Sequence, residues 1–384
     1  MRVVLLTHVA KLSGAEIGLV RFIRSAGQID ATVIVPEDGP LVGALREAGA
    51  RVEVLPLASV AREARRADIA PGAAQALAAA HVGAYVPRLA LRLRELGPDV
   101  VHAISLKSGV YGSLAARLAG RPVLWHLHDF LAPPYLNPRL ARAMRQVVTH
   151  LPNALVAPSP RCLAAVGPGV GRLPTAVFPF PVPLPERTAE VRPEVRRVGI
   201  VGRITPWKGQ DVFLRGFARA FPDGDEPVRA RVVGSALFGE EDFERELHAL
   251  ADELGIAERV DFVGFRSDVE QELLDLDLLV HASVLPDPLP GVVLEGMGTG
   301  VPTISSDNGG QAEHVAEADA GLLFRAGDPD ALAAAMRRAA ADHELRLGLS
   351  ARGREKARDF APETLVERIL AFYGEMLARR GVAR

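Results

Sequence analysis

The fold of this 384-residue chain is decided by the stretch Asp287-Pro288-Leu289-Pro290-Gly291-Val292-Val293-Leu294-Glu295-Gly296-Met297. Segments typical of strand and turn flank this stretch, at residues 278–281 before it and at residues 300–305 after it. This order predicts a strand, a loop, a helix and a second strand, with the loop at the carboxyl end of a parallel sheet. Open α/β sheets bind their ligands at that edge.

Two carboxylates, those of Asp287 and Glu295, bracket the predicted loop. Negative charge does not attract phosphate, but a carboxylate accepts hydrogen bonds from hydroxyl groups. Sugars and ribose present such hydroxyls. The stretch therefore predicts a hydroxyl-rich ligand at this edge of the sheet.

Short apolar strands alternate with Ala-rich helices in two series along the chain. The predicted strands are residues 3–7, 31–35, 52–55, 100–104, 123–127 and 154–157 in the first series, and 198–201, 230–233, 260–263, 278–281, 302–305 and 321–324 in the second. Runs that are apolar throughout are typical of strands buried on both faces, and the alternation with helices predicts parallel sheets. The length alone favours two domains.

A proline-rich run at residues 178–185 (Phe-Pro-Phe-Pro-Val-Pro-Leu-Pro) separates the two series. Proline at alternate positions prevents a helix and favours an extended link. We therefore place an N-terminal domain at residues 1–180 and a C-terminal domain at residues 181–364. A long surface loop within one domain is the alternative.

Composition bounds the function. A formal net charge of −2 gives no overall attraction to nucleic acid. The single cysteine, Cys162, excludes an intrachain disulfide and is compatible with a reducing compartment. No apolar run approaches the 18 residues typical of a membrane span. We expect a cytoplasmic protein, with peripheral attachment to a membrane as the alternative.

A second motif is Gly202-Arg203-Ile204-Thr205-Pro206-Trp207-Lys208-Gly209, directly after the predicted strand at 198–201. Its guanidinium can bond to two phosphate oxygens at once, and its ammonium adds a compact charge. The helix that follows would direct a positive N-terminal dipole at the same place. The motif predicts a diphosphate site; a surface loop with two solvated cations is the alternative.

These two motifs resemble those of the retaining nucleotide-sugar glycosyltransferases of glycosyltransferase family 4, which have the GT-B fold. Two further stretches follow in the same order as in that family: Val263-Gly264-Phe265-Arg266-Ser267-Asp268, similar to a nucleotide-base loop, and Asp307-Asn308-Gly309-Gly310-Gln311-Ala312-Glu313, similar to a glycine turn. Weaker matches in the first half are Ser13-Gly14-Ala15-Glu16 and His126-Leu127-His128-Asp129. The four stronger motifs span residues 198–313.

The resemblance implies an α/β protein of the GT-B class, with two Rossmann-like domains whose parallel sheets face each other across a cleft. It implies that the first domain holds the acceptor, that the second holds the donor, and that a last helix at about residues 365–384 packs back on the first. The implied enzyme is a retaining hexosyl- or glycosyltransferase (EC 2.4 class) that uses a UDP-, GDP- or ADP-sugar. Its acceptor is a hydroxyl of a sugar, a lipid-linked molecule or a small molecule, and it needs no metal or other cofactor.

The resemblance also implies which residues form the site. The implied catalytic residues are His128, Arg203, Lys208, Asp287 and Glu295. The implied donor-binding residues are Gly14, Gly202, Arg203, Lys208, Phe265, Arg266, Pro290, Gly291, Val292 and Glu295. The family usually has glutamate where this chain has Asp287, which leaves the donor sugar open. The His126 and His128 pair lacks the third ligand that a metal site needs.

Two other functions are compatible with these motifs. The chain could be a nucleotide-sugar-binding module without turnover, or a GT-B epimerase or phosphorylase. The acceptor is not identified by sequence. Tyr85, Arg88, Arg92 and Arg94 are candidates for binding a lipid-linked or polyanionic acceptor, and a solvated helix face is the alternative.

Overall fold

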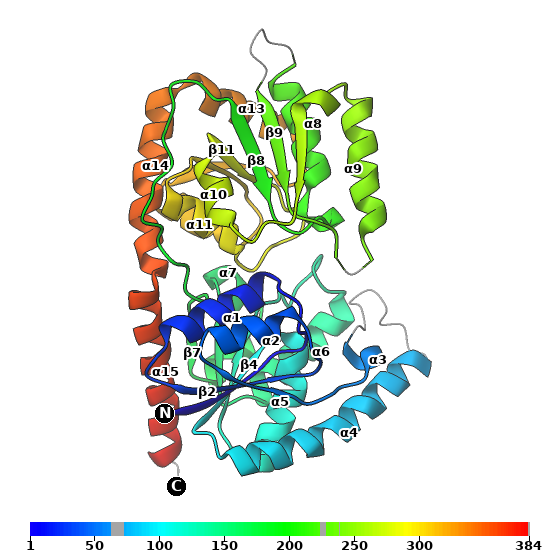
Figure 1. The fold of residues 1–384 in the computed structure, drawn as a ribbon. Helices are drawn as coiled ribbons and strands as arrows, with labels where there is room; N and C mark the ends of the chain where they lie inside the picture. Colours follow the sequence, from blue (N-terminus) through cyan, green and yellow to red (C-terminus); the bar gives the residue numbers. More distant parts are fainter. Residues whose placement is uncertain (63–72, 223–227, 238, 383–384) are drawn as a thin grey trace. The chain divides into compact units, whose positions relative to one another are not determined.

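The chain folds into two compact units, each built on its own parallel sheet (Figure 1). A computed structural model describes residues 1–62, 73–222, 228–237 and 239–382. Unit 1 comprises Met1–Pro181 and Pro362–Arg384, and unit 2 comprises Val182–Ala361. The chain thus leaves unit 1 within the proline-rich run and returns to it near residue 362.

Unit 1 contains a seven-stranded sheet in which all neighbouring strands are parallel. In sheet order its strands are β3 (Arg51–Val54), β2 (Asp30–Val35), β1 (Arg2–Leu6), β4 (Val100–Ile104), β5 (Val123–His126), β6 (Ala154–Ala157) and β7 (Thr175–Val177). Six of these strands match the predicted ones. The seventh, β7, was not predicted, because its three residues are half-buried at the sheet edge and form no continuous apolar run.

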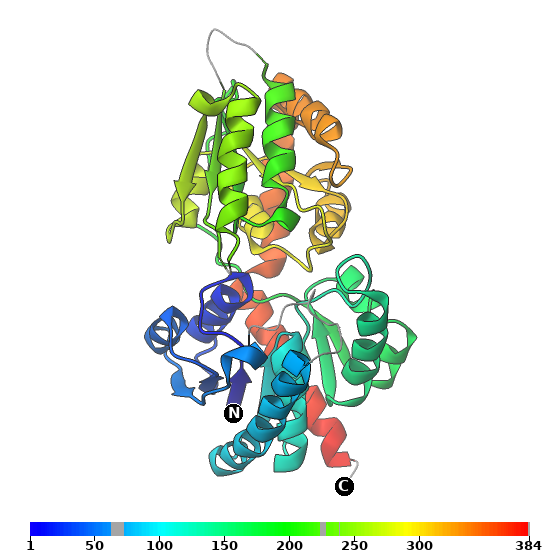
Figure 2. The ribbon, with the colours of Figure 1, turned by 90° about the vertical axis from the view of Figure 1, so that its right-hand side faces the viewer.

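Helices cover both faces of this sheet. They are α1 (Gly14–Ser25), α2 (Pro40–Glu47), α3 (Ser59–Arg62), α4 (Ala73–Leu96), α5 (Leu106–Ala119), α6 (Pro138–His150), α7 (Pro160–Ala164) and α15 (Pro362–Val382). From β1 the sheet grows toward one edge, through β2 to β3, and from β4 it grows toward the other edge, through β5 and β6 to β7. Right-handed crossovers therefore place α1 and α2 on one face and α4, α5 and α6 on the other (Figures 1 and 2).

Unit 2 contains a six-stranded parallel sheet, and all six strands match predicted ones. In sheet order they are β10 (Val260–Gly264), β9 (Arg229–Val233), β8 (Arg197–Val201), β11 (Leu278–His281), β12 (Thr303–Ser306) and β13 (Gly321–Phe324). From β8 the sheet grows one way, through β9 to β10, and from its parallel neighbour β11 it grows the other way, through β12 to β13. This reversal is the topological switch point at which open α/β sheets bind ligands.

The helices of unit 2 enclose its larger hydrophobic core. They are α8 (Gln210–Ala220), α9 (Glu241–Glu253), α10 (Val269–Leu274), α11 (Gly291–Thr299), α12 (Gly310–Glu317), α13 (Pro329–Ala341) and α14 (His343–Ala357). Phe213 and Phe217 of α8 and Met336 of α13 are fully buried in that core. Across the described part of the chain, no helix is both long and apolar enough to cross a bilayer.

The C-terminal helix α15 packs into unit 1 through aromatic and polar contacts. The Tyr373 hydroxyl lies 2.6 Å from Nδ1 of His102, a strand residue of the sheet. The Phe372 ring meets the Phe178 ring edge-on at a centroid distance of 6.0 Å. Residues near the chain end therefore complete the core that the first strands begin.

Three histidines cluster in this core beside Phe180. The His126 ring lies 5.4 Å from the His102 ring and 4.2 Å from the His128 ring, measured between centroids, and the Phe180 ring stacks on His128 at 5.3 Å. Burial lowers the pKa of His102 to about 3 and that of His128 to about 4, and it holds the pKa of His126 well below its usual range. The cluster is therefore neutral at neutral pH.

We predict that unit 1 loses stability in mild acid. Unfolded imidazoles bind protons near pH 6.5, whereas His128 in the folded protein stays neutral down to about pH 4. The unfolded state then holds more protons, so the free energy of unfolding should be constant above about pH 6.5 and fall below it. Each histidine adds a slope of about 1.4 kcal/mol per pH unit between the two pKa values.

The measurement is chemical denaturation at a series of pH values, from neutral pH down to the folded pKa of His128 at about 4. Unfolding is monitored by tryptophan fluorescence. The chain has two tryptophans, so a Trp207→Phe background leaves the fully buried Trp125 as the reporter of unit 1. In that background His126→Gln should flatten the slope, and His150→Gln, on the exposed end of α6, should not. A slope that His126→Gln leaves unchanged would contradict the account.

Candidate functional site

Two loops meet at the switch point of unit 2: residues 202–209 after β8 and residues 282–290 after β11. The backbone N–H of Val284 donates to the carbonyl of Trp207 at 2.9 Å, which ties the loops together. Gly209 has a φ of 72°, and a Cβ at this position would lie 2.1 Å from the carbonyl oxygen of Ala282. Only glycine permits this approach, so the second glycine of the Gly202–Gly209 motif serves loop packing.

Lys208 and Asp287 form an ion pair at this meeting point. The Lys208 ammonium bonds to Oδ2 of Asp287, and the two side chains are 18% and 8% exposed. Burial opposes the charge on Asp287, but the adjacent lysine and His281 outweigh it and hold the pKa of the carboxyl well below its usual range. The phosphate-binding lysine and the sugar-binding carboxylate of the sequence prediction are thus direct partners here.

Behind this pair lies a buried polar chain that sequence analysis missed. His281 Nε2 lies 3.6 Å from Oδ2 of Asp287 and 2.9 Å from the Ser283 hydroxyl, and its Nδ1 lies 3.4 Å from the Ser305 hydroxyl. Burial lowers the pKa of His281, and the lysine charge lowers it further. Asp287 is therefore in contact with a neutral imidazole on the side of the sheet. The signal in the sequence was a polar residue at the end of an otherwise apolar strand.

The glycine turn at residues 307–313 holds Asp287 from a third side. The backbone N–H of Gly310 donates to the carbonyl of Asp287 at 2.9 Å. A Cβ on Gly309 would lie 2.7 Å from the same oxygen. Three of the four stronger motifs therefore converge on Asp287.

The N-terminus of α11 opens directly after this loop. Pro290 occupies the N-cap position and forms no side-chain hydrogen bond to the helix, so the first N–H groups, at Gly291 and Val292, keep the partial positive charge of a helix start. Glu295 is half-buried one turn on, and its Oε1 lies 3.7 Å from the position that a Cβ of Gly291 would occupy. The structure thus brings Glu295 and Gly291 together.

Arg203 belongs to the same loop as Lys208 and is half-buried. The Gln210 side chain donates to its carbonyl at 2.8 Å, which fixes the backbone of the loop. Gly202, the first glycine of the motif, extends from β8 and donates to the carbonyl of Val233 at 2.9 Å. Arg203 and Lys208 therefore sit on one constrained strand-to-helix connection.

Phe265 and Arg266 lie in the loop after β10, at the same end of the sheet. Phe265 is 57% exposed, so its ring face is available for stacking. Arg266 directs Nε to Glu272 at 3.3 Å. Gly234 connects this loop to the loop after β8. Its N–H donates to the carbonyl of Gly264, and a Cβ on Gly234 would lie 2.0 Å from the carbonyl oxygen of Gly202.

In unit 1 the candidate residues lie after β1 and β5. Gly14 begins α1, and no other atom lies within 4 Å of the position its Cβ would take, so its backbone is accessible. Glu16 is buried and accepts a hydrogen bond from Thr7 at 3.3 Å; burial raises its pKa. Glu16 therefore shapes the loop around Gly14.

His128 lies two residues after β5 and is half-buried at the margin of the histidine cluster, whereas His126 is fully buried in it. Asp129 accepts from the N–H of Leu106 at 3.1 Å and from the Tyr135 hydroxyl at 3.1 Å. Asp129 thus anchors the start of α5. Of the two histidines in this motif, His128 is the more exposed.

The acceptor candidates on α4 divide into two kinds. Tyr85 is buried and meets the Tyr111 ring edge-on at 5.2 Å, so it belongs to the core and not to a ligand site. Arg92 is paired with Glu53 at 2.6 Å. Arg88 and Arg94 remain exposed on the helix. Among the residues that the structure describes, no three His, Cys, Asp or Glu side chains are placed to hold a metal ion.

Comparison with known families matches both halves of the chain. The model of glycosyltransferase family 4 matches residues 30–184, and the model of the glycosyl transferases group 1 matches residues 187–356. The second match contains the site of unit 2.

Curated relatives include D-inositol 3-phosphate glycosyltransferases from several bacteria. The one from Stackebrandtia nassauensis is 32% identical over 190 residues, which cover 48% of this chain and 43% of that protein. The one from Jonesia denitrificans is 28% identical over 305 residues, which cover 72% and 71%. The lipopolysaccharide core biosynthesis glycosyltransferase LpsE of Rhizobium meliloti is 34% identical over a segment that covers 31% of this chain and 35% of LpsE. The chain thus spans less than half the length of the Stackebrandtia and Rhizobium relatives it matches.

Solved structures match the whole chain. Anabaena Alr3699/HepE in complex with UDP and glucose is 25% identical with a TM-score of 0.83, covering 98% of this chain and 100% of its own. The same protein has been solved with UDP-glucose. Sucrose-phosphate synthase of Thermosynechococcus elongatus shares the fold at 17% identity, with a TM-score of 0.79 over 99% of this chain and 100% of its own. With both halves matched in sequence and the GT-B fold matched throughout, the chain is a family 4-like glycosyltransferase.

Proposed function

We propose that this chain transfers a sugar from a nucleoside diphosphate sugar to an acceptor hydroxyl, with retention of anomeric configuration. The observation that carries the proposal is the Lys208–Asp287 ion pair at the switch point, next to the N-terminus of α11. One cation for a diphosphate and one carboxylate for a sugar hydroxyl lie within bonding distance of each other. A donor that joins a diphosphate to a sugar offers a partner to each of these groups.

Departure of the nucleoside diphosphate builds negative charge on its phosphate oxygens. Lys208, Arg203 and the first N–H groups of α11 would stabilise that charge more in the transition state than in the ground state. The loop that carries Arg203 and Lys208 is fixed by hydrogen bonds to its backbone, which limits the reorganisation that the reaction requires. The acceptor proton passes to the leaving phosphate on the same face, as the family resemblance implies.

The two carboxylates have separate roles in this proposal. Glu295 accepts hydrogen bonds from the ribose hydroxyls, and Asp287 accepts one from the transferred sugar. Lys208 and His281 both lie at Oδ2 of Asp287, so we assign Oδ1 to the sugar. Phe265 stacks on the base.

The donor we propose first is a UDP-sugar, because Alr3699/HepE, at 25% identity over the whole chain, has been solved with UDP and UDP-glucose. The inositol-phosphate and lipopolysaccharide relatives favour a saccharide or polyol hydroxyl as acceptor. GDP- and ADP-sugars are the other donors to test.

We predict transfer without a divalent cation, since protein cations and a helix N-terminus neutralise the leaving group. The full chain, incubated with UDP-, GDP- or ADP-glucose and a panel of saccharide acceptors, should release the free nucleoside diphosphate and a glycosylated product. The rate should be equal in EDTA and in added Mg²⁺. Donor binding without any product would favour a binding module, and loss of turnover in EDTA would show that a metal is required.

Lys208→Ala should lower kcat by about 10²–10³-fold, because it removes one preorganised contact to the developing phosphate charge. It also leaves Asp287 buried without its partner, which destabilises the fold. The double variant Lys208→Ala/Asp287→Asn should therefore recover thermal stability but not turnover.

The matched control is Lys356→Ala, which removes another lysine–carboxylate contact of unit 2, 3.0 Å from Glu317 and remote in sequence from the switch-point loops. It should leave kcat unchanged. A Lys208→Ala enzyme with near-normal kcat at saturating donor would remove Lys208 from the mechanism.

Asp287→Glu should change donor preference while leaving binding of the free nucleoside diphosphate intact. The longer side chain moves the carboxylate by one methylene relative to Lys208 and to the sugar. The check is the ratio of kcat/KM values for a set of UDP-hexoses, together with the dissociation constant of UDP. Equal changes in the affinity for UDP and for the whole donor would show that Asp287 does not contact the sugar.

A further inference from the structure

The lysine loop of unit 2, residues 202–209, is held by a carboxylate from a different loop. The Thr205 hydroxyl donates to Oε1 of Glu240 at 2.7 Å. Thr205 is fully buried and Glu240 is half-buried, and the two residues lie 35 positions apart in the chain. A hydrogen bond to a carboxylate is shorter and stronger than one between neutral groups. The contact therefore joins the loop after β8 firmly to the start of α9.

Thr205 stands where a side chain normally caps a helix. It is the N-cap residue of the single-turn 3₁₀ helix Pro206–Lys208, yet its side chain forms no capping bond. Its backbone carbonyl closes the turn by accepting from the N–H of Lys208 at 3.0 Å. The hydroxyl is directed to Glu240 instead, so the turn that carries Lys208 is fixed from outside its own loop.

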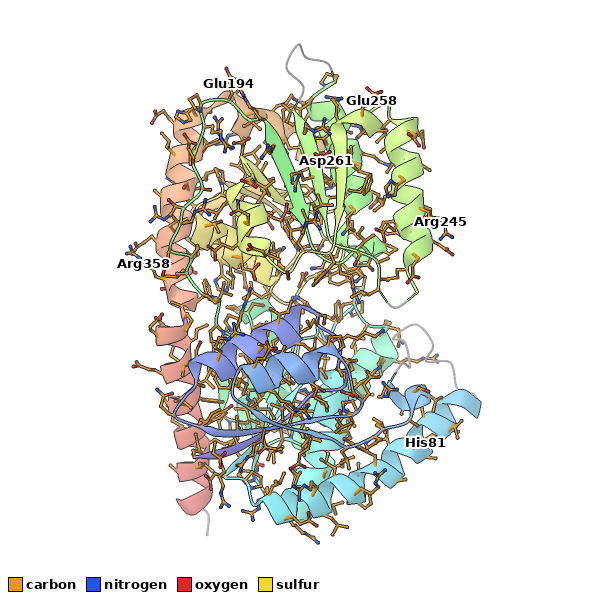
Figure 3. All side chains as sticks on the ribbon, viewed as in Figure 1. His81, Glu194, Arg245, Glu258, Asp261 and Arg358 are labelled. Atoms are coloured by element: carbon orange, nitrogen blue, oxygen red, sulfur yellow. The ribbon has the colours of Figure 1, made fainter. Side chains whose placement is uncertain are left out.

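Two carboxylates at the start of α9 hold two neighbouring loops. Glu244 accepts from the backbone N–H of Ala236 at 3.0 Å, which ties the loop after β9 to its own helix. Glu240 precedes Glu244 by four residues, the spacing of neighbours on one helix face, and reaches the lysine loop. The exposed Asp242 and Arg245 pair with each other, and Arg245 points away from the sheet (Figure 3).

The charge of Glu240 is unfavourable for a site that binds diphosphate. A carboxylate on this loop repels the phosphate groups that Arg203 and Lys208 are proposed to attract. A direct electrostatic role would therefore oppose donor binding. Oε2 of Glu240 is buried, and none of the described residues offers it a hydrogen bond. The contribution of Glu240 thus lies in the one bond that Oε1 accepts from Thr205.

We propose that Glu240 is a positioning residue for sugar transfer. It acts through Thr205, because their hydrogen bond orients the turn Pro206–Lys208 and so presents the Lys208 ammonium to the donor diphosphate. Small displacements of a catalytic group lower the rate of the chemical step strongly. The inference rests on the proposed function, in which Lys208 stabilises the leaving group, and adds a residue that lies outside the sequence motifs.

Trp207 lies within this turn and reports on its position. The Lys208 ammonium lies 4.6 Å from the centroid of the half-buried indole. The other tryptophan of the chain, Trp125, is fully buried in unit 1, so a substitution in unit 2 should change fluorescence through Trp207. The first measurement is acrylamide quenching of the full chain without donor or acceptor. Acrylamide is neutral, so a change of charge does not alter its approach.

Glu240→Ala should raise the quenching constant, because the released turn exposes the indole. Glu240→Gln keeps an oxygen for the Thr205 hydroxyl and should quench like the parent. Thr205→Val has the same shape without the hydroxyl and should match Glu240→Ala. The double variant should add nothing further, since both changes remove one bond. The control is Glu241→Ala, which removes the exposed carboxylate next in the chain and should change nothing.

Turnover at saturating donor is the second measurement. Glu240→Ala should lower kcat about tenfold, the order expected for the loss of a hydrogen bond to a charged group. Glu240→Gln should recover most of the parent rate, and Glu241→Ala should keep it. A through-space effect of the charge predicts that the alanine and glutamine variants behave alike and bind UDP more tightly. A purely structural role predicts a lower thermal midpoint for Glu240→Ala with an unchanged kcat.

The proposal is overturned if Glu240→Ala is quenched like the parent, if its kcat is unchanged, or if Glu240→Gln loses as much kcat as Glu240→Ala. Thr205→Val takes the place of Glu240→Ala in each comparison if the alanine variant does not fold. A parent chain that releases no nucleoside diphosphate would refute the proposed function instead. The quenching comparison would then still decide whether Glu240 holds the turn.

Discussion

The candidate site of unit 2 depends on one buried charge pair, Lys208 with Asp287. A buried carboxylate is costly without a partner of opposite charge. Three loops meet around Asp287, and one of them supplies that partner, Lys208. Gly209 lets the lysine loop approach the strand end, Gly310 fixes the Asp287 backbone, and His281 supports the carboxylate from below. The pair therefore joins the loops of the site, and in the proposed function it is also the group that contacts the donor.

The reversal of strand order explains why these loops meet at all. β8 and β11 are neighbours in the sheet, although 76 residues separate the last residue of β8 from the first of β11. Helices leave the two strands toward opposite faces, which opens a crevice at their carboxyl ends. In unit 1 the same reversal lies between β1 and β4, and Gly14 follows the first of these strands. Each unit thus presents its candidate residues at one edge of its sheet.

Twelve of the thirteen strands were predictable because buried parallel strands are continuous apolar runs. β7 was not predicted because it is short and half-buried. The site motifs were also recognisable, since each is a local run on one loop. The pairing of Lys208 with Asp287 was not, because it joins residues 79 positions apart. The contact between His281 and Asp287 was not predictable either, because it depends on how the end of β11 packs in the folded sheet.

The path of the chain has a consequence for how the protein is made. Unit 2 is one continuous segment, whereas unit 1 is closed by α15, whose Tyr373 bonds to His102 and whose Phe372 packs on Phe178. During translation the first sheet emerges early, yet its last core-forming helix leaves the ribosome after all of unit 2. The second unit can therefore complete its fold before the first, reversing their order in the gene. Until α15 has emerged, the nascent first sheet would expose the surface that this helix later covers.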